Sequence, residues 1–203
     1  MNETQHLASP ERFQAALRRF DEENSRDPNV ETVNGVKQPR ELIYAQWLTD
    51  WVLKLAPDAS EPLRLAARCQ HLCRWVIPRN SYPMTKPGYL QWRHKLKQFH
   101  AEKSGGILRE LGYPEETVQR VQDLNLKKYF PTDPESRVLE DALCLVFLER
   151  QLTDLASKST EEKMINALQK SWAKMSPAGQ AEALILSYSP AEKALLEKAL
   201  SPK

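Results

Sequence analysis

The chain has 203 residues, of which 41% are hydrophobic and 28% charged, a balance that suits a compact folded protein and argues against disorder. It contains no long apolar run, and its start, MNETQHLASPERF, has neither a basic nor an apolar stretch, so we expect no membrane span and no secretory signal. Its three cysteines, an odd number, argue against a disulfide framework, and the expected location is the cytoplasm.

Apolar residues recur at spacings of three and four along most of the chain, and only six glycines occur, so we predict an all-α fold. The first helix is expected at residues 10–24, with Ser9 as its N-cap. Residues 25–38 are expected to form a loop with a turn at Asn34 and Gly35, because no strand-like alternation stands out there.

The remaining helices are expected over 39–55, over 61–76 after an N-cap at Ser60, over 89–111 before a stop at Gly112, from Pro114, within 132–158, and from Ser159, Ser176 and Ser189. Residues 142–148 are apolar on every side, which predicts that the helix within 132–158 is central to the core. We therefore expect a single helical domain over residues 9–157, with a C-terminal helical extension over residues 158–203 packed on it.

Positive charge is concentrated in one segment, although the formal net charge of the chain is only +2. Residues 68–103 contain eight lysines and arginines and a single acid, Glu102. A solvated face normally mixes both signs, and like charges without compensation repel one another. The segment therefore predicts either an anionic ligand or acids that another helix supplies.

Two of the predicted helices carry a basic edge beside their apolar face. On the helix at 61–76, the expected apolar face is Leu65, Cys69, Leu72 and Val76, and the edge beside it is Arg64, Arg68, His71 and Trp75. On the helix at 89–111, the expected apolar face is Tyr89, Trp92, Leu96 and Phe99, and the edge beside it is Arg93, Lys97, His100 and Ser104.

If these two helices face one another, their basic edges bring His71 and His100 onto the walls of one pocket. The loop between the helices would then act as a lid. The expected ligand is small and anionic, and its candidate binding residues are Arg68, Arg74, Trp75, Arg79, Tyr82, Lys86, Trp92 and Arg93. The alternative is that these cations form a solvated boundary whose aliphatic stems cover the edge of the core.

Two other groups have more than one interpretation. Cys69 and Cys73 are four residues apart and could form half of a metal site, but no second pair completes it, so packing is the favoured interpretation. Asp141 and the preceding glutamate open the helix within 132–158, where acids interact favourably with the helix dipole. Asp141 could instead lie beside His71 and His100, as a metal ligand or as the group that orients a histidine.

The stretch FHAEKSGGILRELGYPEETVQRVQDLNLKKYF, followed by VLEDALCLVFLE, resembles the later half of the HD superfamily of metal-dependent phosphohydrolases. LRLAARCQHLCRW stands in the place of that superfamily's LLHD helix, and ELIYAQWL in that of its first ligand helix. The resemblance implies an HD-like fold and a hydrolase in which His71, His100 and Asp141 are catalytic, with one divalent metal ion on His71 and Asp141.

The sequence departs from that superfamily at its metal positions. Gln46 stands where the first histidine would be, and His71 is followed by Leu72 in place of an aspartate. Of the four usual ligands only His71 and Asp141 remain, with His100 as a substitute. These departures favour the alternative of a non-catalytic relative that binds an anionic metabolite or an acidic protein segment.

Most of the chain, including YAQWLT, LAPDASEPLRLAARCQHLCRW, SYPM and FHAE, is also similar to a family of bacteria, fungi and plants known only as a domain of unknown function. That resemblance implies no activity. The sequence thus predicts an enzyme that acts on a phosphate- or carboxylate-bearing small molecule, or a binding protein for such a molecule. Nucleic acid is a weaker expectation, because the sequence pI is only about 8.4 and no nucleic-acid-binding motif is present.

Overall fold

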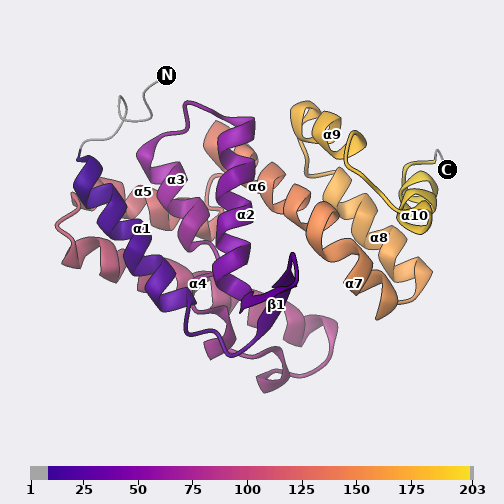
Figure 1. Ribbon diagram of the computed structural model, residues 1–203, viewed down its shortest axis with the longest axis horizontal. Coiled ribbons are helices and arrows are strands. Elements are labelled where there is room, and N and C mark those ends of the chain that lie inside the picture. The colour runs from indigo at the N-terminus through magenta and orange to yellow at the C-terminus, as the bar shows by residue number, and fades with distance from the viewer. Residues whose placement is uncertain (1–8, 202–203) are drawn as a thin grey trace. The chain divides into compact units, whose positions relative to one another are not determined.

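A computed structural model describes residues 9–201 and shows a predominantly helical chain with one small sheet (Figure 1). In chain order the elements are α1 (Pro10–Asn24), β1 (Val30–Val33), β2 (Val36–Pro39), α2 (Arg40–Leu55), α3 (Glu61–Cys69), the short 3₁₀ helices η1 (Arg74–Val76) and η2 (Arg79–Ser81), α4 (Lys86–Glu110), α5 (Glu115–Leu126), α6 (Pro134–Val146), the π-helical segment η3 (Phe147–Gln151), α7 (Leu152–Ser157), α8 (Glu161–Trp172), α9 (Pro177–Leu184) and α10 (Pro190–Leu200). The predicted all-α class is confirmed. Within residues 9–201, no helix has the length and apolar character that crossing a membrane requires.

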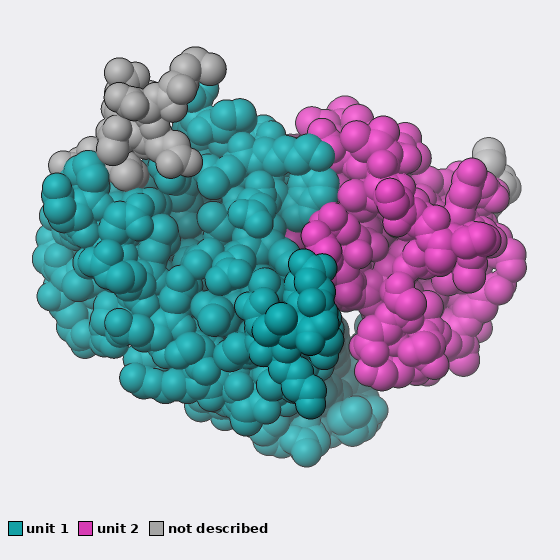
Figure 2. All heavy atoms as spheres, in the orientation of Figure 1, with its two compact units in different colours: residues 1–136 teal, residues 137–203 magenta. Residues whose placement is uncertain are grey.

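The chain divides into two compact units, residues 1–136 and residues 137–203 (Figure 2). In the first unit α4 packs on α5, and α3 contacts α1, α2 and α5 (Figure 1). In the second unit α8 packs against α10 and α7. The predicted extension, residues 158–203, lies wholly inside the second unit.

A serine or threonine cap combined with an early proline explains where five of the helices begin. The hydroxyl oxygens of Ser9, Ser60, Thr85, Ser176 and Ser189 each accept a hydrogen bond from the backbone N–H three residues later. Each of these helices also has proline in its first two positions, where the missing N–H is not needed. The starts predicted after Ser9, Ser60, Ser176 and Ser189 are therefore confirmed.

The expected loop at 25–38 instead contains a hairpin. β1 and β2 pair antiparallel around Asn34 and Gly35, which both have positive φ, 51° and 79°. Such a pair of residues forms the tight turn whose twist matches two antiparallel strands. The turn prediction was right and the absence of strands was wrong, because the exposed Val30 and Val36 give these short strands no apolar face to signal them.

The helix expected at 61–76 ends at Cys69, so the prediction of helix over residues 70–76 was wrong. The chain turns over residues 70–73, where Cys73 adopts φ 54°, before it enters η1. The Cys73 N–H donates to the buried Asn24 Oδ1 at 2.9 Å, a tertiary hydrogen bond that takes the place of the helical one. Consequently Val76, expected in the core, is 55% exposed.

α4 is the longest helix described, and its buried face differs from the expected one. Trp92, Leu96, His100 and Ser104 are buried along it, whereas Tyr89 is 45% exposed. The prediction for Tyr89 was wrong, because the buried line continues from Trp92 and Leu96 to His100 and Ser104, while Arg93 and Lys97 are only half-buried.

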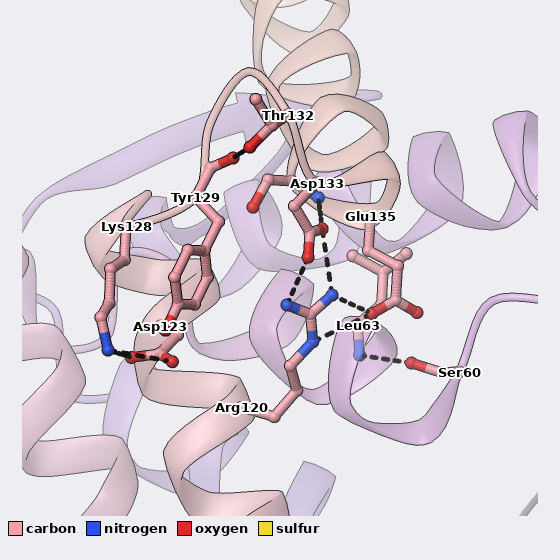
Figure 3. A network of polar contacts seen from close by, with 10 residues as sticks. Ser60, Leu63, Arg120, Asp123, Lys128, Tyr129, Thr132, Asp133 and Glu135 are labelled. Carbon is pink, nitrogen blue, oxygen red and sulfur yellow. Dashed lines mark hydrogen bonds and ion pairs between the residues drawn. The ribbon is translucent and has the colours of Figure 1, made fainter.

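The helix expected within 132–158 is interrupted by one π-helical segment between α6 and α7. Ala142, Leu145, Val146 and Leu148 are all at least 97% buried, which confirms that this stretch is buried. Arg120 of α5 donates to Asp133 at 2.6 Å and to Glu135 at 2.6 Å and thereby joins α5 to the start of α6 (Figure 3).

Candidate functional site

The structure brings His71 and His100 together. His71 lies in the turn after α3, His100 lies on α4, and their ring centroids are 5.9 Å apart. His100 Nδ1 is 2.8 Å from the Leu72 carbonyl oxygen, which links α4 directly to the turn. The turn after α3 and helix α4, which carry parts of the two predicted basic edges, therefore meet at these two histidines.

His71 is a neutral imidazole with its proton on Nδ1. Arg74 Nη1 lies 3.2 Å from His71 Nε2, and because a guanidinium only donates, Nε2 must accept. The Nδ1–H then lies on the side of Glu41, whose Oε2 is 3.5 Å from Nδ1. The ring stacks on Tyr44 at 4.4 Å. Burial, followed by the positive charge of Arg74, lowers the pKa of His71 well below its ordinary value.

His100 is also a neutral imidazole, and it uses Nδ1 and not Nε2 for its hydrogen bond. Its Nδ1 faces a carbonyl and so carries the proton, which leaves a lone pair on Nε2. Nε2 is buried and has no hydrogen-bond partner among the described residues. Burial, and next the neighbouring His71, lower the pKa of His100 to about 3.

Glu41 is the acid of this cluster and lies in the first turn of α2. Its backbone N–H donates to Asp27 Oδ2 at 3.0 Å, and its carbonyl accepts from the Asn24 side chain at 3.4 Å. The carboxylate is 9% exposed, and its Oε1 lies 3.9 Å from Arg74 Nε. Burial raises the pKa of Glu41, and the charge of Arg74 opposes that rise.

A cavity of about 370 Å³ opens beside Glu41 and Arg74. We call it the Glu41–Arg74 cavity, and its lining residues are Pro28, Asn29, Arg40, Glu41, Arg74, Trp75, Ile77, Pro78, Arg79 and Trp92. His71 contacts Glu41 and Arg74 without being a lining residue. Of the predicted ligand-binding residues, the structure therefore gathers four around this cavity.

Trp92 forms a fixed part of the cavity wall. Its indole N–H donates to the Ile77 carbonyl at 2.8 Å, and the Arg74 and Arg79 guanidiniums lie 5.0 and 5.9 Å from its ring centroid. The Arg79 guanidinium also donates to the carbonyls of Tyr82, Pro83 and Thr85. The loop is thus held by hydrogen bonds to its own backbone.

Arg68, a predicted ligand-binding residue, has a protein partner. Its Nε and Nη2 donate to the two carboxylate oxygens of Asp21 at 2.7 and 2.6 Å. Lys103 likewise pairs with Glu23 at 3.0 Å. Acids of α1 and α2 therefore compensate part of the positive charge of residues 68–103, a role that the sequence assigned to the acids of the helix within 132–158.

The other predicted binding residues lie away from the cavity lining. Tyr82 is half-buried in the loop, and its carbonyl accepts from Arg79. Lys86 is exposed at the start of α4, and Arg93 is half-buried two turns further along. None of these three side chains lines the Glu41–Arg74 cavity.

Asp141 belongs to the second unit, where it holds the start of α9. Its Oδ1 accepts from the Ser176 backbone N–H at 2.7 Å, and its Oδ2 accepts from the Ser176 hydroxyl at 2.5 Å. Gly179 packs so closely that a Cβ there would lie 2.6 Å from the Asp141 carboxyl carbon. Within residues 9–201, no three His, Cys, Asp or Glu side chains are grouped as a metal site requires.

Glu41 is the main site residue that the sequence reasoning missed. It precedes the buried Tyr44, Leu48 and Val52 of α2 by three, seven and eleven positions, so helical spacing places it on the apolar face. A charged residue in phase with a core stripe is the signal that could have identified it. Arg40 and Asn29, the other polar lining residues that were missed, carry no comparable signal.

The comparisons with known proteins concern the family and not the chemistry. No curated protein and no solved structure matches the chain. The resemblance to the HD superfamily accordingly stays a prediction. A family model described as Domain of unknown function (DUF4202) matches residues 14–196, from within α1 to within α10. The chain therefore belongs to the DUF4202 family of domains of unknown function.

Proposed function

We propose that the Glu41–Arg74 cavity binds a small molecule that carries a phosphate or carboxylate group. Three arginines and one acid line the cavity, so its wall carries an excess of positive charge. Guanidinium groups match the oxygens of carboxylate and phosphate with paired hydrogen bonds. The volume of about 370 Å³ lies in the range of small-molecule sites.

The placement of Arg74 carries this proposal. Its side chain is 24% exposed, its Nη1 donates to His71, and its guanidinium lies against Trp92. These contacts hold the group in one orientation, while its Nη2 has no hydrogen-bond partner among the described residues. An arginine fixed by the protein but with donors left over is suited to an incoming anion.

Binding by the purified chain tests the proposal. Inorganic phosphate and short carboxylates are titrated into the wild-type protein, with heat change and thermal midpoint as readouts. We expect the midpoint to rise with anion concentration, because an anion that binds only the folded chain stabilises it. Arg74→Ala should weaken binding by about tenfold or more, the loss of charge-assisted hydrogen bonds.

Lys95→Ala is the matched control, because Lys95 is an exposed cation on α4 outside the cavity lining. It should bind like the wild type. Equal binding by Arg74→Ala and the wild type would contradict the proposal, as would equal weakening by Lys95→Ala, which indicates only a general effect of net charge.

Acid–base chemistry on the bound anion is the second candidate, and Glu41 is the observation that favours it. A carboxyl group with a raised pKa lines the cavity and contacts a histidine, the arrangement from which a general acid is built. Glu41 would hold a proton for a leaving group, and His71 would position the carboxyl. This assigns the acid of the expected hydrolase chemistry to Glu41, which lies outside the HD ligand set.

The donor set does not fit the expected metal ion. His71 Nε2 accepts from Arg74, and both carboxylate oxygens of Asp141 accept from Ser176. Product release from a panel of nucleotides and phosphate esters, with and without Mg²⁺, Mn²⁺ or Zn²⁺, separates enzyme from binding protein. Turnover that Glu41→Gln reduces at least tenfold would establish acid–base chemistry; anion binding without turnover would leave the binding function alone.

A further inference from the structure

The geometry points to a narrower ligand class: we propose that the Glu41–Arg74 cavity binds an amino acid, whose carboxylate pairs with Arg74 and whose ammonium group pairs with Glu41. This inference rests on the proposed function, because it names the class of anion that the same cavity takes. The inference differs from the proposed function because it requires the ligand to carry a positive charge as well as a negative one.

The Glu41 carboxylate is a buried negative charge at the wall of the cavity. It is 91% buried, lines the cavity, and its Oε2 has no hydrogen-bond partner among the described residues. Arg74 Nε lies 3.9 Å from Oε1, and His71 Nδ1 lies 3.5 Å from Oε2; neither contact is a good hydrogen bond. The Oε2 atom is itself enclosed by protein, so a ligand N–H group would pair with Oε1, the carboxylate oxygen on the side of Arg74, and would offset the cost of burying the charge.

The cavity wall places a negative and a positive charge side by side. Glu41 and Arg74 are neighbours of opposite sign in the wall. An α-amino acid carries its two opposite charges on either side of one carbon, so it can present each charge to its complement. A phosphate dianion at the same place would bring its second negative charge against Glu41, where like charges in a partly buried site repel strongly.

The third step concerns the side chain of the ligand. Trp75, Trp92, Ile77, Pro28 and Pro78 form the apolar part of the lining. The other half of the lining is polar or charged, so these five residues are the part of the wall that an apolar ligand side chain would contact. The cavity therefore favours large apolar or aromatic amino acids over acidic ones.

Calorimetric titration of the full chain with matched pairs of ligands tests the inference. The probes are L-phenylalanine, L-tryptophan and L-leucine, each beside the acid that lacks only the ammonium group: 3-phenylpropanoate, indole-3-propanoate and 4-methylpentanoate. For at least one pair, we expect the amino acid to bind about tenfold tighter or more, the gain from one charge-assisted hydrogen bond to a buried carboxylate.

Variants assign that preference to Glu41. Glu41→Gln should bind the two members of a pair equally, while Glu41→Asp, which keeps the charge, should retain part of the preference. Glu22→Gln is the control, since Glu22 is an exposed acid on α1. Circular dichroism and the thermal midpoint establish that each variant is folded before binding is compared.

The outcomes separate the two proposals. If the deaminated acids bind the wild type as tightly as the amino acids do, or if only inorganic phosphate binds, the inference is overturned and anion binding stands. A preference that persists unchanged in Glu41→Gln also overturns it. If neither kind of acid nor phosphate binds, the proposed function fails together with the inference.

Discussion

Glu41 occupies a place where an acid weakens the fold. The helix dipole and the Asp27 contact favour its backbone position in the first turn of α2, but its carboxylate is buried without a donor on Oε2. Because burial raises its pKa above that of the unfolded chain, the folded state binds the proton more tightly, and stability falls as pH rises through that interval. A role in ligand recognition gives a physical reason for such a residue at the cavity.

His100 makes a prediction about acid stability. Its pKa is about 3 in the folded chain, compared with about 6.5 when exposed, so the unfolded state takes up the proton first as pH falls. Stability due to neutral His100 is therefore complete above pH 6.5 and is lost towards pH 3. Between pH 6.5 and pH 4 this residue should account for a loss of roughly 3 kcal/mol in the free energy of unfolding.

Urea unfolding of His100→Asn at a series of pH values measures this loss. The asparagine amide can still donate to the Leu72 carbonyl but does not titrate, so the variant should lose less stability below pH 6.5 than the wild type. His94→Asn, at an exposed position on the same helix, should follow the wild-type curve. Parallel acid limbs for His100→Asn and the wild type would show that His100 is not the group responsible.

At the scale of elements, the turn at residues 70–73 decides where the cavity groups lie. Ending α3 at Cys69 places His71 in the turn, away from the single helical edge that the spacing predicted, and places Arg74 in η1. Asn24 at the end of α1 holds both sides: its Oδ1 accepts from Cys73 N–H, and its Nδ2 donates to the Glu41 carbonyl. One buried side chain thereby ties the turn to the start of α2.

Replacing Asn24 should therefore affect both stability and the site. Asn24→Ala leaves the buried Cys73 N–H without an acceptor and should lower the free energy of unfolding by about 1–3 kcal/mol. Denaturant unfolding measures this loss, and anion titration should show weaker binding at a temperature where the variant is folded. Asn80→Ala, at an exposed position in η2, is the comparison. An unchanged unfolding midpoint for Asn24→Ala would refute the assigned role.

At the scale of the whole molecule, the sequence predicts features that depend on neighbours in the chain. Ser9, Ser60 and Ser189 cap helices through backbone groups three residues away, so local chemistry alone identifies those starts. Residues 142–148 are apolar all round, and burial follows from that property alone.

What the sequence did not predict depends on distant partners. Helical spacing continued through Cys73, but a hydrogen bond to Asn24, 49 residues earlier, favours the turn. The meeting of His71 and His100 was predicted from charge and periodicity, whereas their acid, Glu41, comes from α2. Arg68 could not be separated from Arg74 by sequence, since only the fold shows that Asp21 pairs with the one and the cavity adjoins the other.

The hydrogen bonds of Arg79 have a consequence for affinity. Its guanidinium donates to the carbonyls of Tyr82, Pro83 and Thr85, so the loop beside the cavity is ordered before a ligand binds. If a flexible loop became ordered only when the ligand bound, the loss of conformational entropy would weaken the affinity. Here that ordering is accomplished during folding, and recognition can proceed on a preorganised scaffold.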